Sequence, residues 1–555
     1  MTVSVESRLP APQLSPGISW RPYIGLGGVM LGSMIATLGT RVTTFGLADL
    51  RGSLSAGFDE GAWITTALGV GQLISGISCP YIASVVGGRR LLLGGIVVAF
   101  VAFVLAPLSH TVHGYIAAQF FAGLGTGTFI PLTIIFIIRH LPKPLLPYGM
   151  AIYAMNLEIS LNVAASLEGF YLDHWSWHWI SWQYCLVLPL MGLCVWIGMP
   201  KDTPIRDPLK NLDGSGLVYA WLGLGALYIA LDQGNRRDWL GSGLIHGLLV
   251  VGALSLVAFV SREMTASRPA LNLRLLAVPG LLVLFALLAG FRFIILSTAY
   301  VIPTYLQTLQ NYRSLDIGAV LIWMAALQVF LVLPLAMLIK RLDPRWTLIA
   351  GAALVAVACL MLTRLTGFWA TGDFLPSQIL QAVGQSLALT SLVALVATTV
   401  KPEQAVTVGA FMQTSRLLGG EAGTAFMQTF VRVREQIHSN LLGLHVQGQA
   451  TDTAHRLAEY GYSVAHRLAT TSQTAALELK LLATAVGQQA AVLAYSDAFA
   501  AAAGVAVLCC ILAAFVPKAG SAQAVPPQPA PTRRPEAIGR RHGQTEAAGA
   551  CGPGR

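Results

Sequence analysis

Apolar runs of about twenty residues recur along most of the chain, and they constrain the fold more than any other feature. A helix needs ~20 mostly apolar residues to cross the hydrocarbon core of a bilayer. Backbone polar groups cannot stay unpaired in lipid, so runs of this length are expected to form helices. The sequence therefore predicts an all-α polytopic membrane protein of about fourteen transmembrane helices. The runs fall near 23–47, 61–83, 91–108, 114–138, 148–168, 180–199, 215–231, 243–260, 279–302, 317–339, 347–365, 375–399, 405–430 and 492–516.

Charge is scarce and is placed between the apolar runs. Only 11% of the 555 residues are charged, whereas soluble proteins carry roughly 25%, so we expect the lipid bilayer to cover most of the surface. The formal net charge is +10, but the positive residues stand in short connectors, which argues against a nucleic-acid partner. The seven cysteines show no metal-type or disulfide spacing, and we expect no metal and no other cofactor.

Lysine and arginine alternate between connectors. The even-numbered connectors hold most of them, including Lys340 and Arg341, while the short odd-numbered ones hold few, such as Arg313. Because positive residues stay on the cytoplasmic side, the even connectors and both termini are predicted to be cytoplasmic. The expected location is the bacterial inner (cytoplasmic) membrane.

Two segments outside the apolar runs are long and polar. The tail 517–555 is rich in Pro, Gly and Arg and is predicted to be disordered. The connector 431–489 repeats Ala-His-Arg-Leu-Ala after eleven residues, which would place Leu457 and Leu468 on one helical stripe, with Gly461 interrupting the helix. This indicates a periplasmic helical hairpin over the outer mouth; a solvated helix without a partner is the alternative.

Several stretches occur in a characteristic order and spacing. They are Leu231–Trp239, Pro269–Leu275, Ile302–Gln307 and Gln413–Gly420, together with Gly87, Arg89 and Arg90 in the connector after the second run. In these stretches the chain resembles the fourteen-span drug:proton antiporter branch of the major facilitator superfamily, the EmrB/QacA-like group. The resemblance is spread over most of residues 23–516.

The resemblance implies a domain plan and a mechanism. Two six-helix bundles would surround a central cavity and rock to give alternating access, with an inserted central helix pair between them in the sequence. Gly87, Arg89 and Arg90 would form the gating loop. The expected division is a cytoplasmic N-terminal tail 1–22, an N-terminal bundle 23–205, a two-helix insert 206–275, a C-terminal bundle 276–516 containing the periplasmic loop, and a cytoplasmic tail 517–555.

The chain also departs from the pattern of that group. Gly39 replaces the acidic residue of the first helix, with Arg41 nearby, and Ser84 replaces the Asp of the loop motif. Gln119 stands where the fourth helix usually carries Arg, and the antiporter motif of the fifth helix reads Ala164–Gly169. The chain is therefore a divergent member, and the group's proton and gating residues do not transfer directly.

Ionisable residues inside the apolar runs are the candidates for proton coupling or substrate binding, because each costs on the order of 2.5–3.5 kcal/mol at mid-bilayer on insertion scales. Glu158 ranks first, near the middle of the fifth run, with Asn162 on the same face. A carboxyl group in an apolar cavity holds a proton more readily than one in water; the alternative is a structural pair between Glu158 and Arg41. The remaining candidates are Arg292, Arg416, Glu168 and Glu421. The five-residue spacing of Arg416 and Glu421 predicts that they do not share a face well.

Aromatic residues and methionines are candidates for the cavity lining. They are Tyr153, Met155, Phe291, Phe293, Tyr300 and Met412. Ordinary helix packing is the alternative for each of them.

These features favour a secondary active transporter over an enzyme, since the sequence has no P-loop, HExxH or Gly-x-Ser-x-Gly motif. We expect proton-coupled efflux of amphiphilic drugs or toxic organic compounds, with protons and a small-molecule substrate as partners. The alternative is a proton-coupled transporter of one specific metabolite, with import as one of its two open directions. By the resemblance, the long outer loop suggests a periplasmic adaptor of the membrane-fusion type and an outer-membrane channel.

Overall fold

The structure is a computed structural model that describes residues 20–201, 214–266, 271, 273–399, 404–446, 450–465 and 471–516. Within these ranges the chain forms helices and no β-strand. The elements are α1 (Arg21–Phe45), α2 (Leu47–Ser53), α3 (Phe58–Gly61), α4 (Trp63–Val86), α5 (Gly88–Leu105), η2 (Ala106–Leu108), α6 (Val112–Thr126), α7 (Phe129–His140), η3 (Lys143–Leu145), α8 (Leu146–His174), α9 (Trp179–Gly198), α10 (Gly214–Gly234), η5 (Trp239–Gly241), α11 (Gly243–Thr265), η6 (Leu273–Ala277), α12 (Pro279–Leu296), the π-helix η7 (Ser297–Val301), α13 (Ile302–Leu309), α14 (Ser314–Arg341), α15 (Pro344–Leu362), α16 (Leu375–Thr399), α17 (Ala405–His445), α18 (Thr451–Ala465) and α19 (Thr471–Ala514).

Thirteen of the described helical segments are long and apolar enough to cross a membrane. They match thirteen of the fourteen predicted runs. The remaining run, 405–430, is the first part of α17, which packs against α12 and α19 on one side and α4 and α7 on the other. This segment carries Arg416 and Glu421, so it is less apolar than the others although it lies within the bundle.

The spanning helices pack as two bundles with an added pair. In the first bundle α1 contacts α8 and α9, and α6 contacts α4 and α5; in the second, α15 contacts α16 and α19, and α12 contacts α17. The bundles meet where α8 lies along α14 and where α4 and α7 lie against α17. The inserted helix α10 packs on both α4 and α17, at the border between the bundles, whereas α11 packs mainly on α10.

Small residues allow the close approach of helices in the first bundle. A Cβ atom on Gly123 would lie 2.3 Å from the Leu68 carbonyl oxygen, and one on Gly125 would lie 2.5 Å from the Gly95 carbonyl oxygen. No side chain fits at such distances, so these glycines bring α6 against α4 and α5. The span Val112–His140 also has a break at Gly127 and Thr128, between the end of α6 and the start of α7.

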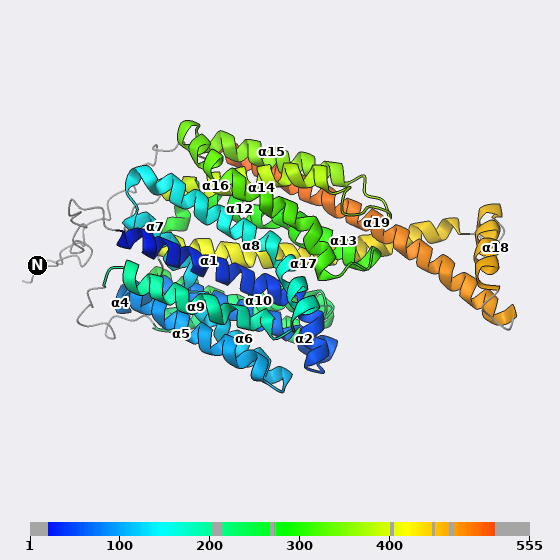
Figure 1. Cartoon of the computed structure of the whole chain (residues 1–555), viewed down its shortest axis with the longest axis horizontal. Coiled ribbons are helices and arrows are strands. Elements are labelled where there is room, and N and C mark those ends of the chain that lie inside the picture. Colours follow the sequence, from blue (N-terminus) through cyan, green and yellow to red (C-terminus); the bar gives the residue numbers. More distant parts are fainter. Residues whose placement is uncertain are drawn as a thin grey trace, which may run out of the picture.

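The polar connector between α17 and α19 forms a helical extension that projects from one end of the bundle (Figure 1). We call this the extension end. The helices α17 and α19 continue well past the bundle and α18 lies across their tip, so the segment stands out from the bundle and does not cover it as a cap. The expected interruption at Gly461 is wrong, because α18 runs unbroken from Thr451 to Ala465. Gly461 instead faces α19, where a Cβ atom would lie 2.3 Å from the Glu478 carboxylate.

Other sequence predictions fall on residues outside the described ranges. These are Leu468 of the repeat, most of the N-terminal tail and the C-terminal tail 517–555.

Candidate functional site

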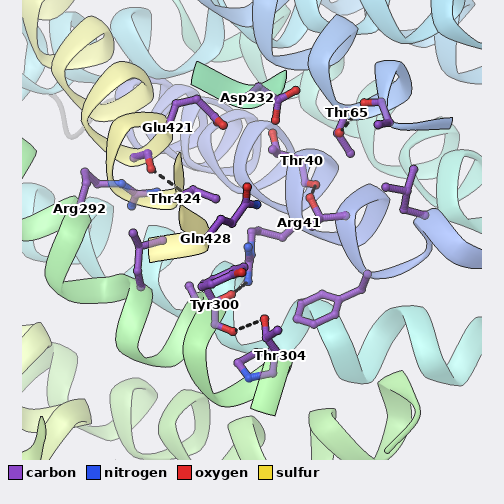
Figure 2. Close-up of a pocket in the computed structure, with 18 of the residues that line it drawn as sticks. Thr40, Arg41, Thr65, Asp232, Arg292, Tyr300, Thr304, Glu421, Thr424 and Gln428 are labelled. Carbon is purple, nitrogen blue, oxygen red and sulfur yellow. Dashed lines mark hydrogen bonds between the residues drawn. The ribbon is translucent and has the colours of Figure 1, made fainter. Parts of the chain in front are cut away.

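A cavity of about 580 Å³ lies between the two bundles, toward the extension end (Figure 2). Its walls come from the last third of α1, the start of α4, the end of α10, the stretch from α12 through α13, and the middle of α17. Both bundles and the inserted helix α10 therefore contribute to one chamber. The lining mixes apolar side chains such as Leu161 and Ile295 with an unusual number of charged ones.

Three arginines from both bundles line this cavity: Arg41 on α1, Arg292 on α12 and Arg416 on α17. Arg41 donates to the Ala299 carbonyl oxygen through Nη2, and Arg416 donates from Nε to Gln413 Oε1 at 3.1 Å. Arg292 lies beside α17, since its Nε would be 3.8 Å from a Cβ placed on Gly420. Several of their nitrogens, including Arg416 Nη2, are buried without a hydrogen-bond partner.

A carboxyl pair lies in another part of the wall, where Asp232 of α10 lies beside Glu421 of α17. An ionised carboxylate can only accept hydrogen bonds, so the two groups can hydrogen-bond to each other only when one of them carries a proton. Tyr228 lies beside Glu421, and Thr66 donates to Asp232 Oδ2. Gln233 Nε2 donates to the same Asp232 oxygen at 3.2 Å. Two neighbouring carboxyl groups favour one shared proton over two negative charges, and this pair lies inside a polar network that joins α4, α10 and α17.

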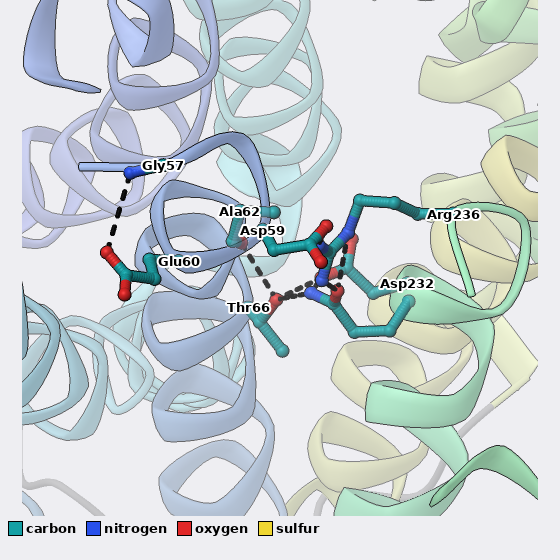
Figure 3. A network of polar contacts seen from close by, with 8 residues as sticks. Gly57, Asp59, Glu60, Ala62, Thr66, Asp232 and Arg236 are labelled. Atoms are coloured by element: carbon teal, nitrogen blue, oxygen red, sulfur yellow. Dashed lines mark hydrogen bonds and ion pairs between the residues drawn. The ribbon is translucent and has the colours of Figure 1, made fainter. Parts of the chain in front are cut away.

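The same network reaches the mouth of the cavity (Figure 3). Arg236 donates from Nε to Gln233 Oε1 at 3.0 Å and forms an ion pair with Asp59. Asp59 is 65% exposed at its side chain. The carboxyl pair is thus connected to solvent at the extension end by a short chain of polar side chains.

The turn after α10 fixes this region to α17. Asp238 and Trp239 adopt left-handed backbone angles, with φ of 58° and 44°, and Trp239 Nε1 donates to Thr429 Oγ1 at 2.9 Å. The hydroxyl of Thr429 also hydrogen-bonds with Asn235 at 3.2 Å. The stretch 231–239 therefore holds α10 against α17.

Glu158, the first-ranked candidate from the sequence, does not line the cavity. It is fully buried on α8, and neither carboxylate oxygen has a hydrogen-bond partner. The alternative of a Glu158–Arg41 ion pair is wrong, because among the described residues no such pair forms and Arg41 instead donates to Ala299. The charge that acts on Glu158 is that of Arg292, which itself lines the cavity.

Two other polar candidates lie between the bundles. Asn162 Nδ2 donates to Gln328 Oε1 at 3.0 Å, which joins α8 to α14. Glu168 is buried near Ser314, the first residue of α14, and its oxygens form no hydrogen bond of normal geometry. Both residues lie at the α8–α14 contact and outside the cavity lining.

The aromatic and methionine candidates divide in the same way. Tyr300 lines the cavity, whereas Tyr153, Met155, Phe291 and Met412 are buried in the helix packing and are absent from its lining. Phe293 packs on Phe426.

The predicted gating loop lies at the end of the bundle opposite the cavity. Gly87 has a φ of 101° between α4 and α5, which favours glycine. Arg89 is buried, donates to the Trp196 carbonyl oxygen at 2.7 Å and lies over the Trp196 ring. Arg90 is exposed. Arg89 therefore attaches the start of α5 to α9.

Sequence reasoning missed Asp232, Gln233, Arg236 and Tyr228, which all line the cavity. Asp232, Gln233 and Arg236 belong to the stretch Leu231–Trp239, which resembles a family signature, but the sequence predicts a connector there, and Tyr228 lies in the apolar run before it. The spacing of Arg416 and Glu421 predicts that they do not share a face well, yet both line the cavity.

Two bundles around a shared, charge-lined cavity define the chain as a polytopic α-helical transporter. Residues 29–426 match the Major Facilitator Superfamily, so the chain belongs to that family. Residues 432–526 also match the DegT/DnrJ/EryC1/StrS aminotransferase family. That segment consists, where described, of the end of α17, α18 and α19, and α19 packs within the transporter bundle, so this partial match does not establish a second family.

Relatives of known name extend over most of the chain. It is 24% identical to the probable multidrug resistance protein EmrY of Escherichia coli strain K12, over 79% of this chain and 85% of that protein. It is 24% identical to the fatty acid resistance protein FarB of Neisseria gonorrhoeae, over 78% and 86%, and 22% identical to the multidrug export protein EmrB of Escherichia coli strain K12, over 74% and 80%. The chain is a divergent EmrB-like member, as the sequence predicted.

Solved structures agree on the fold. The human organic anion transporter MFSD10 aligns with a TM-score of 0.52 at 14% identity, covering 89% of this chain and all of that one. A POT family transporter aligns with a TM-score of 0.55 at 13% identity, covering 89% and 97%. At these identities the likeness shows the fold alone.

Proposed function

We propose that this protein is a proton-driven exporter of amphiphilic organic compounds in the bacterial inner membrane. The observation that carries the proposal is the Asp232–Glu421 carboxyl pair in the wall of a cavity shared by both bundles. A group that gains and loses a proton within the substrate chamber can link proton movement to substrate movement. The names of the relatives, which include multidrug export and resistance proteins, support the outward direction.

The proposed cycle follows from where the cavity lies. The distribution of Lys and Arg favours an orientation with the extension end on the periplasmic side and both termini in the cytoplasm. While the cavity faces that side, the pair takes up a proton through the polar groups around Arg236 and Asp59. Rocking of the bundles about the α8–α14 and α4–α17 contacts then turns the cavity to the cytoplasm, where the proton leaves and substrate enters.

The test is transport into inverted membrane vesicles, in which export appears as uptake. Vesicles with the protein should accumulate a fluorescent amphiphile when respiration acidifies the interior, and a protonophore should abolish that accumulation. A panel of one anionic, one cationic and one neutral amphiphile avoids a bias in substrate choice. Gradient-dependent movement in the opposite direction would instead support the importer of a single metabolite.

The helical extension supports a second part of the proposal, a periplasmic adaptor of the membrane-fusion type that leads to an outer-membrane channel. Ile437, Leu441 and Leu444 lie four and three residues apart on α17, so they share one face, and they are 39%, 51% and 70% exposed. Arg434 and His438 contact Asp497 of α19, and Leu441, seven residues after Arg434, lies beside them along α17. The polar groups thus join the two helices while an apolar stripe faces outward, as a docking helix would require.

The adaptor is tested by co-purification with a membrane-fusion adaptor expressed from the same cells. Leu441→Glu combined with Leu444→Glu should abolish co-purification. The exposed pair His455→Ala and Glu459→Ala on α18 is the control and should leave it unchanged. Unaltered co-purification of the leucine variant would contradict a docking role for the stripe.

A further inference from the structure

We propose that the cavity selects organic anions, that is, amphiphiles with a negatively charged head group and an apolar tail. The inference rests on the proposed transport function and specifies the substrate class of the same cavity. It follows from the arrangement of Arg41, Arg292 and Arg416.

These arginines keep unused hydrogen-bonding capacity inside the cavity. A guanidinium group has five N–H donors, yet among the described contacts Arg41 donates only through Nη2, Arg416 donates only through Nε and Arg292 forms no hydrogen bond. Within the described ranges no carboxylate lies at ion-pair distance from any of the three. Arg416 is only 8% exposed. A buried charge without a counter-ion is unfavourable, so an anion that entered the cavity would meet donors already in place.

The acidic groups of the cavity do not cancel this charge. Asp232 and Glu421 are neighbouring carboxyl groups, which favour one shared proton, so the pair counts as one negative charge, and Glu158 lies outside the lining. Arg236 forms an ion pair with Asp59, so these two charges cancel and do not change the net charge of the cavity. Three guanidinium charges thus face at most two negative charges, and the chamber stays positive.

The arginines are placed to receive a head group. Arg292 and Arg416 come from the middle of their spans, and Arg292 lies beside Gly420, one turn after Arg416. Planar guanidinium groups on facing helices suit a carboxylate, sulfate or phosphate head, since each of these accepts paired N–H donors.

The remaining lining suits an apolar tail. Leu161, Ile295, Leu296 and Leu417 line the same chamber from α8, α12 and α17. Its volume of about 580 Å³ is within the usual range for pockets that enclose drug-sized ligands, about 300–1,000 Å³. The inside-negative membrane potential also favours outward movement of an anion and inward movement of a proton. The potential therefore drives both movements when an anion is exchanged for an entering proton.

The experiment measures binding of two probes that share a dansyl reporter and an apolar chain but carry head groups of opposite charge. The purified full-length protein is placed in nanodiscs of zwitterionic lipid and titrated with dansyl-undecanoate or with the dansyl-undecyl-trimethylammonium of the same chain length. The anion should bind at least about tenfold more tightly than the cation. Equal binding, tighter binding of the cation, or no binding of either probe would overturn the proposal.

Substitutions of the cavity arginines test which residues cause the preference for the anionic probe. Arg416→Gln and Arg292→Gln should each weaken binding of the anion by about tenfold without weakening that of the cation. Arg416→Lys, which keeps the charge, should retain much of the affinity and covers the case in which Arg416→Gln does not fold. The control is Arg432→Gln, which removes a positive charge from the same helix outside the cavity lining and should change neither probe. Wild-type affinity in both cavity variants would contradict the assignment.

This experiment separates the inference from the proposed function, because binding in nanodiscs needs no proton gradient. Selective anion binding without gradient-driven movement in vesicles would contradict proton coupling and support the anionic substrate class. Gradient-driven export of a cation alone would support proton coupling and contradict the anionic substrate class.

Discussion

Two buried glutamates, Glu158 on α8 and Glu421 on α17, occupy regions of different character. Glu158 is enclosed by helix packing, has no hydrogen-bond partner and does not line the cavity. The charge of Arg292, which does line it, acts on Glu158. Glu421 lines the cavity and lies beside Asp232 and Tyr228. Both are acidic groups within spanning segments, yet only the second has a route for proton exchange with solvent.

The comparison distinguishes the depth of an ionisable residue in the membrane from its access to water or substrate. Depth makes an ionisable residue costly and so marks it as a candidate. Transport also requires that the group meet water or substrate in at least one conformation. The cavity gives that access to Glu421, and the inserted helix α10 supplies its partner Asp232.

The largest expected effect is that of Glu421→Gln. Gradient-driven export in proteoliposomes should fall on the order of 100-fold, the scale of a lost proton-transfer group, because the amide cannot carry the proton. Exchange of labelled for unlabelled substrate without a gradient should continue, and this serves as the control for folding. Normal gradient-driven export would remove Glu421 from the coupling step.

A double variant tests whether the pair acts as one unit. Asp232→Asn alone should also reduce gradient-driven export strongly, and combining it with Glu421→Gln should add no more than about threefold, since residues that act together are not additive. Initial rates at one imposed pH gradient provide the comparison. Fully multiplicative losses would mean that the two carboxyl groups act independently.

Glu158→Gln should have a small effect on transport. The change removes a buried carboxyl without hydrogen-bond partners, so export should stay within about threefold of wild type and thermal stability should be equal or higher. Loss of gradient-driven export, with the protein still folded, would return Glu158 to the centre of the mechanism.

The smallest effect on transport is expected from Arg89→Ala, at the end away from the cavity. Loss of its hydrogen bond to Trp196 should lower the free energy of unfolding by about 1.5–3 kcal/mol, the usual range for a bond to a charged group, and leave substrate affinity unchanged. Thermal unfolding and probe binding measure the two quantities. The exposed Arg90→Ala is the matched control, and a large transport defect in Arg89→Ala at unchanged stability would support a gate instead.

The sequence predicted the fold well because lipid imposes a simple rule on each segment separately. The spans and the candidacy of Arg41, Arg292, Arg416 and Glu421 follow from runs of apolar residues and the charges within them. The family follows instead from the resemblance of stretches such as Leu231–Trp239 and Gln413–Gly420. The least apolar span, α17, carries two of these charges, which is the cost of placing them in the cavity wall.

The composition of the site could not be predicted in the same way. Asp232 stands at the end of an apolar run, where a charge needs no special explanation, and only the packing of α10 against α17 brings it to Glu421. Tyr153 and Met412 looked equivalent to Tyr300 in the sequence, and the rotation of each helix relative to its neighbours decides which of them faces the cavity.

Infrared difference spectroscopy of the purified protein tests the shared proton most directly. A change in pH should alter the C=O stretching band of a protonated carboxyl group in the wild type and in Glu158→Gln, and this change should be absent from Glu421→Gln. The opposite pattern, with the band lost in Glu158→Gln and kept in Glu421→Gln, would contradict the assignment of the exchangeable proton to the Asp232–Glu421 pair.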